Sequence, residues 1–312
     1  LNNDTRTNDA YVNADYTLVA PKVSGYIKNI YVADNQRVKA GQTLATLDDR
    51  DYKIALEMAQ ANLQLSEAKH LSSLAQLEQQ QSIIAQTKAT LLASQASAQY
   101  ASQNAERFNK LYQRGTVAAD DQQKAHSTQR SASAVVRQNE AALTSAEKQV
   151  GVLRAALRQA EADVAVAQAK VSQARLNLSY THIVAPVDGM VGQRSVRLGA
   201  YVNAGTRLLA VVPLHQTYII ANYLETQLAN VQQGQKVLIK IDAMPGKKFT
   251  GHVDSIAPAT GATFSAIQPD NATGNFTKVV RRLPVKILLD GNQPDAKLLR
   301  VGMSAVPEIK IR

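Results

Sequence analysis

The sequence predicts an α+β fold in three parts: a small β-sandwich built from two separated halves, a long antiparallel α-helical coiled-coil hairpin, and a small β-barrel. A motif rich in Val, Gly and Pro occurs twice, a long proline-free segment separates the copies, and several short strand patterns follow the second copy. The halves of the sandwich are expected at 19–48 and 183–213, and the hairpin between them at 49–182, with its tip near 114–118. The barrel with its C-terminal strand is expected at 214–312, and an N-terminal strand at 1–18 joins it.

The two copies of the motif align without a gap between their glycines, which are sixteen steps apart in each copy. The first runs from Val19-Ala20-Pro21 through Gly25 to Gly41, and the second from Val184-Ala185-Pro186 through Gly189 to Gly205. Short apolar runs punctuated by Gly and Pro are typical of short strands and tight turns. Each copy resembles a lipoyl-type half-motif. We therefore expect one split lipoyl-like β-sandwich, in which each half covers the apolar face of the other.

The segment between the copies is rich in Ala, Gln, Leu, Glu and Lys, which are strong helix formers. Its second half keeps a heptad period at Val136, Leu143, Val150, Leu157, Val164, Val171 and Leu178, with a second row three residues further on. Its first half keeps the same period at Leu56, Leu63, His70, Leu77, Ile84 and Leu91. Beside this row we place a second seam row of mostly small residues: Ile54, Ala61, Ala68, Ala75, Ala89 and Ala96. Sustained heptads predict a coiled coil with left-handed supercoil.

The turn of the hairpin is expected at Gly115, which can adopt the left-handed conformation that ends a helix. Thr116 is a candidate cap for the second helix, and Asp120 and Asp121 would lie near the positive end of its dipole. Each arm of the hairpin would be roughly 90 Å long at about 1.5 Å per residue.

The C-terminal third reads as a small β-barrel. Short alternating runs between Gly and Pro turns predict strands and one short helix. The expected strands are 217–223, 236–241, 251–256, 278–289 and 305–311, with a helix at 225–231 and an added N-terminal strand at 7–12.

Composition narrows the function classes. The chain has no Cys, its five His residues show no ligand spacing, and no catalytic triad or phosphate-binding loop is visible, so we expect no metal, no cofactor and no enzyme activity. The net charge of +10 indicates either a mixed solvated surface or an acidic partner such as an anionic membrane surface. Aromatic residues are too few, at 5%, for nucleic-acid binding. No apolar stretch is long enough to span a membrane.

The sequence resembles the periplasmic adaptors called membrane fusion proteins, of the HlyD type, and within them the EmrA-like subgroup of multidrug efflux systems. Besides the three-part organisation, four stretches carry this resemblance: NDAYV at 8–12, ANYLETQ at 221–227, NATGNF at 271–276 and KVVRRLPVKI at 278–287. The resemblance implies an adaptor that links an inner-membrane major-facilitator exporter to an outer-membrane channel and self-associates into a ring or funnel. It implies the periplasm of a Gram-negative bacterium, with an inner-membrane anchor helix upstream of Leu1.

Many such adaptors engage the channel through a tip pattern of Arg, Leu, Leu, Ser, Asp and Ala. The matching positions are Arg107, Leu111 and Ala125, continued by Ala132 and Ala134. Phe108 replaces a Leu, Ala118 the Ser and Gln123 the Asp, so a hydroxyl and a charge are lost. The resemblance assigns channel contact to Arg107, Phe108, Leu111, Gly115, Ala118, Gln123 and Ala125. It assigns an exporter-facing barrel signature to Asn271, Thr273, Gly274, Asn275, Phe276, Arg281 and Arg282.

Two other functions are open. One is a type I secretion adaptor that works with an ABC exporter. The other is a lipoyl or biotinyl carrier domain of an enzyme, in which a Lys on an exposed turn between the halves holds the cofactor. In this sequence the junction lies near Lys53, inside the predicted helix, and the long insertion argues against a carrier.

Overall fold

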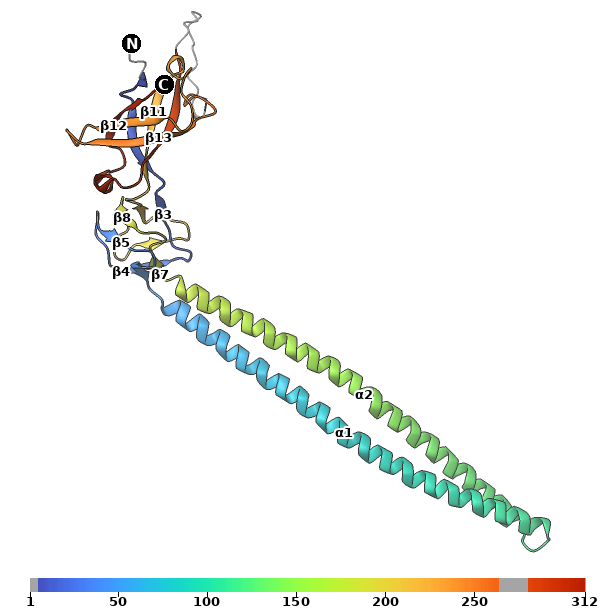
Figure 1. Ribbon diagram of the computed structural model, residues 1–312. Helices are drawn as coiled ribbons and strands as arrows, with labels where there is room; N and C mark the ends of the chain where they lie inside the picture. The colour runs from blue at the N-terminus through green and yellow to red at the C-terminus, as the bar shows by residue number, and fades with distance from the viewer. Residues whose placement is uncertain (1–4, 264–279, 312) are drawn as a thin grey trace, which may run out of the picture. The chain divides into compact units, whose positions relative to one another are not determined.

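The computed structural model describes residues 5–263 and 280–311. The chain divides into two units, of which one is the segment Arg50–Leu178 and the other combines the chain before it with the chain after it (Figure 1). The predicted α+β fold is confirmed, because a split sandwich, a helical hairpin and a β-barrel are all present.

The sandwich consists of two four-stranded sheets, ordered β3-β10-β8-β5 and β7-β6-β4-β9. Both sheets mix strands from the two copies of the motif, so neither copy forms a sheet alone. The first copy supplies β3 (Thr17–Val19), β4 (Gly25–Ile30), β5 (Arg37–Val38) and β6 (Thr43–Leu47). The second supplies β7 (His182–Val184), β8 (Gly189–Gly192), β9 (Tyr201–Val202) and β10 (Leu209–Val212).

Backbone hydrogen bonds between the halves are reciprocal. The Gly41 N–H donates to the Ala185 carbonyl at 2.8 Å, and the equivalent Gly205 N–H donates to the Pro21 carbonyl at 2.9 Å. Both glycines have a positive φ, 82° and 85°, a backbone conformation that residues other than glycine rarely adopt. The matched glycine spacing of the sequence therefore reflects one turn used twice.

The core of the sandwich also draws on both halves. Leu44 and Leu47 from the first half and Leu208, Leu209 and Val211 from the second are almost completely buried. Removing this apolar surface from water is the main stabilising term available to so small a domain. Since the contributions come from both halves, neither half can bury its apolar face without the other.

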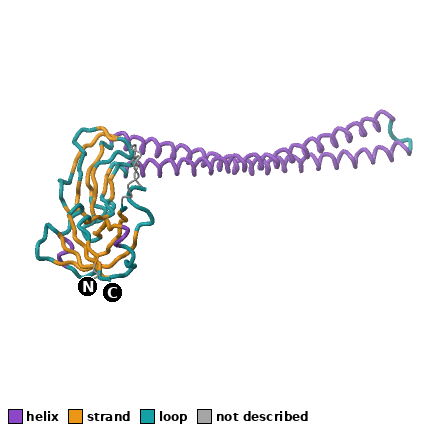
Figure 2. Tube along the Cα trace, turned by 90° about the horizontal axis from the view of Figure 1, so that it is seen from above, coloured by secondary structure: helices purple, strands orange, loops and turns teal. Residues whose placement is uncertain are grey.

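The hairpin consists of α1 (Arg50–Gln113) and α2 (Ala119–Ser179), with 64 and 61 residues. At about 1.5 Å per residue, each helix is roughly 90 to 95 Å long. The two helices run side by side and are joined by one short turn (Figure 2). In the described parts of the chain, no helix combines the length and apolarity needed to cross a membrane.

The seam predicted for the second helix is confirmed. Every residue in the row from Val136 to Leu178, and in the row three residues further on, is buried or half-buried, and nearly all residues between them are exposed. The most deeply buried members are Ala160, Ala167 and Val171. This heptad pattern is that of an antiparallel two-stranded coiled coil.

For the first helix, one seam row is right and the other is wrong. The row from Leu56 to Leu91 is buried or half-buried, but the small row beginning at Ile54 is exposed along its whole length. The second seam row instead consists of Ala59, Ser66, Ser73, Gln80, Thr87 and Ser94. Apolar periodicity does not reveal this row, because most of its residues are polar. The Gln80 side-chain amide is buried and donates to the Ala146 carbonyl across the hairpin at 2.8 Å.

The barrel is a seven-stranded sheet of order β1-β15-β12-β13-β14-β11-β2, and β2 also pairs with β15, which closes it. Its strands are β1 (Thr5–Arg6), β2 (Ala10–Ala14), β11 (Thr217–Leu224), β12 (Lys236–Ile241), β13 (Lys248–Ile256), β14 (Arg282–Leu289) and β15 (Ser304–Ile309). The N-terminal strand expected at 7–12 is thus two strands, separated at residues 7–9. The helix expected at 225–231 is wrong, because only a 3-10 turn forms there, η1 (Glu225–Gln227), followed later by η2 (Pro294–Leu298).

A large polar side chain, that of Tyr223, lies in the barrel interior. Tyr223 is fully buried among Phe249, Ile287 and other apolar residues, and its hydroxyl donates to the Pro307 carbonyl at 3.2 Å. Burial, with the charge of Glu308 as a second cause, raises the pKa of Tyr223 above its ordinary value. The phenol therefore remains a hydrogen-bond donor that links β11 to β15 across the core.

We predict that cysteines at Tyr26 and Tyr201 form a disulfide within one chain. The two residues lie directly opposite each other on β4 and β9, one from each half, with ring centroids 5.1 Å apart. Facing cross-strand positions are close enough for a disulfide. The chain has no cysteine of its own, so non-reducing electrophoresis and mass mapping read the bond directly. Each single cysteine is the control, and crosslinks only between chains would contradict the split sandwich.

We predict that Val171→Asp destabilises the hairpin by about 3 kcal/mol or more, because it buries an unpaired charge in the seam. Val171 is 2% exposed, whereas Val166 on the same helix is 56% exposed. Val166→Asp therefore makes the same chemical change outside the seam, and its effect should stay within about 0.5 kcal/mol. Thermal melting followed by circular dichroism at 222 nm tests both variants. Equal losses in the two variants would be inconsistent with the seam.

Candidate functional site

The tip of the hairpin is a compact, capped turn. The Gly115 N–H donates to the Tyr112 carbonyl at 2.9 Å, and the Thr116 N–H donates to the Leu111 carbonyl at 3.0 Å. With φ of 72° at Gly115, this is a Schellman C-cap of α1. The Thr116 hydroxyl also donates to Leu111, at 2.8 Å, so Thr116 caps the end of α1 and not, as expected, the start of α2.

The predicted tip residues differ in exposure. Arg107, Gly115, Ala118 and Gln123 are exposed, and Phe108 and Leu111 are half-buried. Ala125 is 7% exposed, because it packs inside the hairpin. Ala125 is therefore a packing residue, and the surface that a partner can reach consists of the other six.

The two helices are held together beside the tip. The Gln122 amide donates to the Asn109 side-chain oxygen at 2.8 Å, and this bond joins the first turns of α2 to the last turns of α1. Sequence patterns gave no signal for this pair. Charged residues near the tip form exposed ion pairs within each helix: Lys110–Glu106 at 3.1 Å and Lys124–Asp120 at 2.8 Å. In the described parts of the chain Arg107 has no such pair, so its guanidinium is available to a partner.

The predicted barrel signature falls only partly within the described structure. Asn271, Thr273, Gly274, Asn275 and Phe276 lie outside the described residues. Arg281 and Arg282 are described, and Arg282 is the first residue of β14. Both arginine side chains are exposed.

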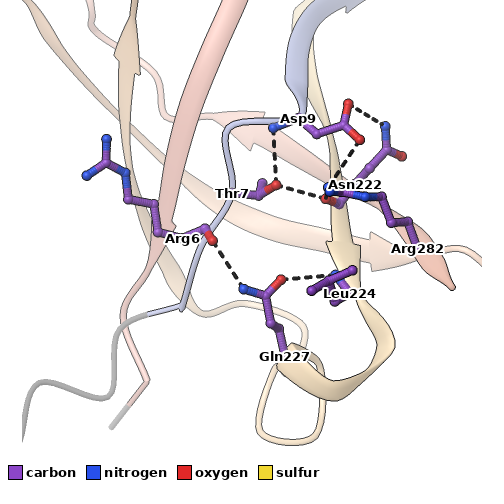
Figure 3. A network of polar contacts seen from close by, with 7 residues as sticks. All are labelled: Arg6, Thr7, Asp9, Asn222, Leu224, Gln227 and Arg282. Atoms are coloured by element: carbon purple, nitrogen blue, oxygen red, sulfur yellow. Dashed lines mark hydrogen bonds and ion pairs between the residues drawn. The ribbon is translucent and has the colours of Figure 1, made fainter. Parts of the chain in front are cut away.

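Arg282 belongs to a polar network, shown in Figure 3, that joins three separate segments of the chain. Its guanidinium lies 3.2 Å from an Asp9 carboxylate oxygen and 3.3 Å from the Asn222 carbonyl. The other Asp9 oxygen accepts the Asn222 amide at 3.3 Å, and the Asp9 carbonyl accepts the Asn222 backbone N–H at 2.8 Å. We call Asp9, Asn222 and Arg282 the clasp.

Further bonds extend the network along the N-terminal segment. The buried Thr7 hydroxyl donates to the Asn222 carbonyl at 2.9 Å and accepts the Asp9 N–H at 3.2 Å. The Gln227 amide donates to the Arg6 carbonyl at 3.3 Å, while its oxygen accepts the Leu224 N–H at 3.0 Å (Figure 3). Residues 6–9 are thus fastened to the end of β11 by both backbone and side chains.

The clasp gives a physical basis for three of the four stretches noted in the sequence. Asp9 lies in the stretch 8–12, Asn222 in 221–227 and Arg282 in 278–287. Sequence reasoning singled out each stretch but gave no signal that they meet. The resemblance assigns Arg282 to an exporter-facing signature, and the structure adds that its guanidinium pairs with Asp9 in the same chain.

The remaining titratable groups offer little for chemistry. Among the described residues no group of three His, Asp or Glu side chains could hold a metal ion. A carrier lysine would need to lie on an exposed turn between two strands. Lys53 instead lies near the start of helix α1. An open groove of about 740 Å³ is lined by Arg37, Lys39 and His215. Its carboxylates already have partners: Asp15 accepts the Tyr218 hydroxyl and Asp188 the Ala40 N–H.

Both β-domains match families of known proteins. Residues 16–214 match the family described as RND MFP, barrel-sandwich hybrid domain, and residues 218–309 match the YknX-like beta-barrel domain. The colistin resistance protein EmrA of Acinetobacter baumannii is 37% identical over 306 residues, which cover 98% of this chain and 86% of that protein. The multidrug export protein EmrA of Haemophilus influenzae is 33% identical, over 98% of this chain and 76% of its own length.

Solved structures show the same fold at lower sequence identity. The crystal structure of MacA from Actinobacillus actinomycetemcomitans aligns with a TM-score of 0.56 and 23% identity, over 99% of this chain and 80% of that one. Together with the family matches and the relatives at more than 30% identity, these findings identify the chain as a member of the membrane fusion protein family, whose members are adaptor proteins and not enzymes.

Proposed function

We propose that this protein is the periplasmic adaptor of a tripartite multidrug efflux pump, and that it links an inner-membrane major-facilitator exporter to an outer-membrane channel. Relatives that align along almost the whole chain are named as multidrug export and colistin resistance proteins. The observation that carries the proposal is the organisation of the chain itself. The chain combines two β-domains with a hairpin roughly 90 Å long, and the tip of this hairpin is capped and presents a free arginine.

The tip is proposed to contact the channel through Arg107, Phe108, Leu111, Gly115, Ala118 and Gln123. Arg107 can donate several hydrogen bonds in a fixed fork to carboxylates or backbone carbonyls. The exposed parts of Phe108 and Leu111 add apolar area. Ala118 and Gln123 provide neither a hydroxyl nor a charge, so we expect few directed bonds there and a weak contact that many copies must share.

The barrel is proposed to face the exporter. The signature assigned by resemblance spans Asn271 to Phe276 and continues to Arg281 and Arg282, and the described part of it lies at the start of β14. We further propose that the chain self-associates into a ring or funnel. The net charge of +10 suits an anionic membrane surface, where Lys and Arg gain about 1 kcal/mol each.

Crosslinked co-purification from native membranes tests the proposal as a whole. The full-length adaptor is expressed in its own host with a photoreactive residue at Gln123, which is exposed at the tip. We expect crosslinks to an outer-membrane channel and co-purification of a major-facilitator exporter, both identified by mass spectrometry. An ABC exporter in place of the major-facilitator protein would instead support a type I secretion adaptor. Absence of any channel crosslink would contradict the role of the tip.

We predict that Arg107→Glu abolishes drug resistance in cells while adaptor level and folding stay normal. The substitution reverses the charge that we place against the channel, and an exposed helix substitution changes stability by only about 0.5 kcal/mol. Arg154→Glu is the matched control, because Arg154 is also exposed on the hairpin but lies far from the tip in sequence. Drug susceptibility is measured beside adaptor abundance and channel crosslinking. Full resistance with Arg107→Glu, or equal loss with Arg154→Glu, would contradict the tip contact.

A further inference from the structure

The N-terminal segment closes the barrel. On one side β2 pairs with β11, from Ala14 opposite Thr217 to Ala10 opposite Ala221. On the other side β2 pairs with β15, and β1 continues the pairing with β15. The barrel therefore depends on a segment that lies more than 200 residues from its pairing partners in the sequence.

The clasp sits where this segment enters the barrel. Asp9 directly precedes β2, Asn222 lies within β11, and Arg282 is the first residue of β14. The Leu224–Arg282 pair is the last in the β11–β14 ladder. The Asp9 carboxylate thus reaches past β11 to the far strand, and it fixes where β14 begins.

The clasp contributes little to stability by itself. The Asp9 and Arg282 side chains are 41% and 47% exposed, and ion pairs of this exposure add little to the stability of a fold. Because the network joins three segments at one point, its role is better explained as holding residues in position. The residue that it holds in position is Arg281, which directly precedes Arg282.

Arg281 differs from Arg282 in its contacts. Its carbonyl accepts the Glu225 N–H at 3.0 Å, so its backbone is fixed to the turn after β11. Among the described residues its side chain has no hydrogen bond or ion pair, and it is exposed. The two adjacent arginines therefore differ. The Arg282 guanidinium is paired within the chain, whereas Arg281 has a fixed backbone and a free guanidinium.

We propose that Asp9 and Arg282 are positioning residues, and that Arg281 is the residue that binds a carboxylate on the periplasmic face of the exporter. This inference rests on the proposed function. A guanidinium pairs with a carboxylate in a fixed bidentate geometry, so the position of the Arg281 backbone decides whether the pair forms. The clasp supplies that position by holding the start of β14 against the N-terminal segment.

The experiment uses the full-length adaptor in native membranes and four variants: Arg281→Glu, Arg282→Glu, Asp9→Arg, and the double charge swap Asp9→Arg/Arg282→Glu. One readout is co-purification of the exporter, identified by mass spectrometry. The other is hydrogen exchange of residues 5–12 in the purified protein. The two adjacent arginines serve as matched controls for each other, because both changes replace an exposed arginine with glutamate.

Arg281→Glu should lower co-purification about tenfold or more, as expected for loss of a charged pair, without changing hydrogen exchange. Arg282→Glu and Asp9→Arg should lower co-purification and also speed exchange at residues 5–12. The charge swap should restore both readouts, which a general loss of folding could not produce. Stronger salt should weaken the wild-type complex more than the Arg281→Glu complex.

Wild-type co-purification with Arg282→Glu, or a charge swap that restores neither readout, would overturn the clasp as a positioning device. Wild-type co-purification with Arg281→Glu would overturn the contact. If the unmodified adaptor co-purifies with no exporter, the proposed function fails and the role of Arg281 fails with it. The exchange measurement still decides whether Asp9 and Arg282 hold the N-terminal segment, so the two failures are distinguishable.

Discussion

Backbone pairing between remote segments is the constraint on which the rest of this molecule depends. The Asn35 N–H donates to the Val191 carbonyl, and the equivalent Gly199 N–H donates to the Ile27 carbonyl, so each half of the sandwich completes the other. The ends of the insertion are brought together by the same sandwich, where the Leu47 N–H donates to the Thr181 carbonyl at 2.8 Å. Closing a loop whose ends already meet costs little extra entropy, even when the loop is long. The length of the hairpin therefore adds little to the entropic cost of closing the sandwich.

The barrel obeys the same constraint at the other end of the chain. Its strands from β11 to β15 leave an open edge on each side, and unpaired edges invite association with other chains. The N-terminal strands cover both edges, so the barrel is complete only when residues 5–14 have joined it. The three parts are nested in sequence order. The barrel strands come first and last among the described residues, the two halves of the sandwich come between them, and the hairpin comes between the two halves.

Sequence reasoning succeeded where a periodic signal reports burial, and failed where it does not. The seam from Val136 to Leu178 was predictable because apolar residues recur there every seven positions. The row beginning at Ile54 has the same period but is exposed, since alanine fits either face of a helix. Gln80 and the serines of the true row gave no apolar signal. The clasp was invisible for a different reason: Asp9, Asn222 and Arg282 meet only in three dimensions, and no single stretch shows which side chains pair.

The polar seam of α1 has a consequence for how the hairpin can work. A row of mostly Ser, Gln and Thr beside the leucine row buries less apolar surface per turn than a second leucine row would, so it stabilises the coiled coil less. A polar residue in a coiled-coil core can specify register at a cost in stability. The Gln80 amide meets the Ala146 carbonyl only in one alignment of the two helices, and the Gln122–Asn109 bond repeats that selection near the tip. The hairpin therefore trades stability for one register, and one register decides which residues of α1 and α2 lie side by side at the tip.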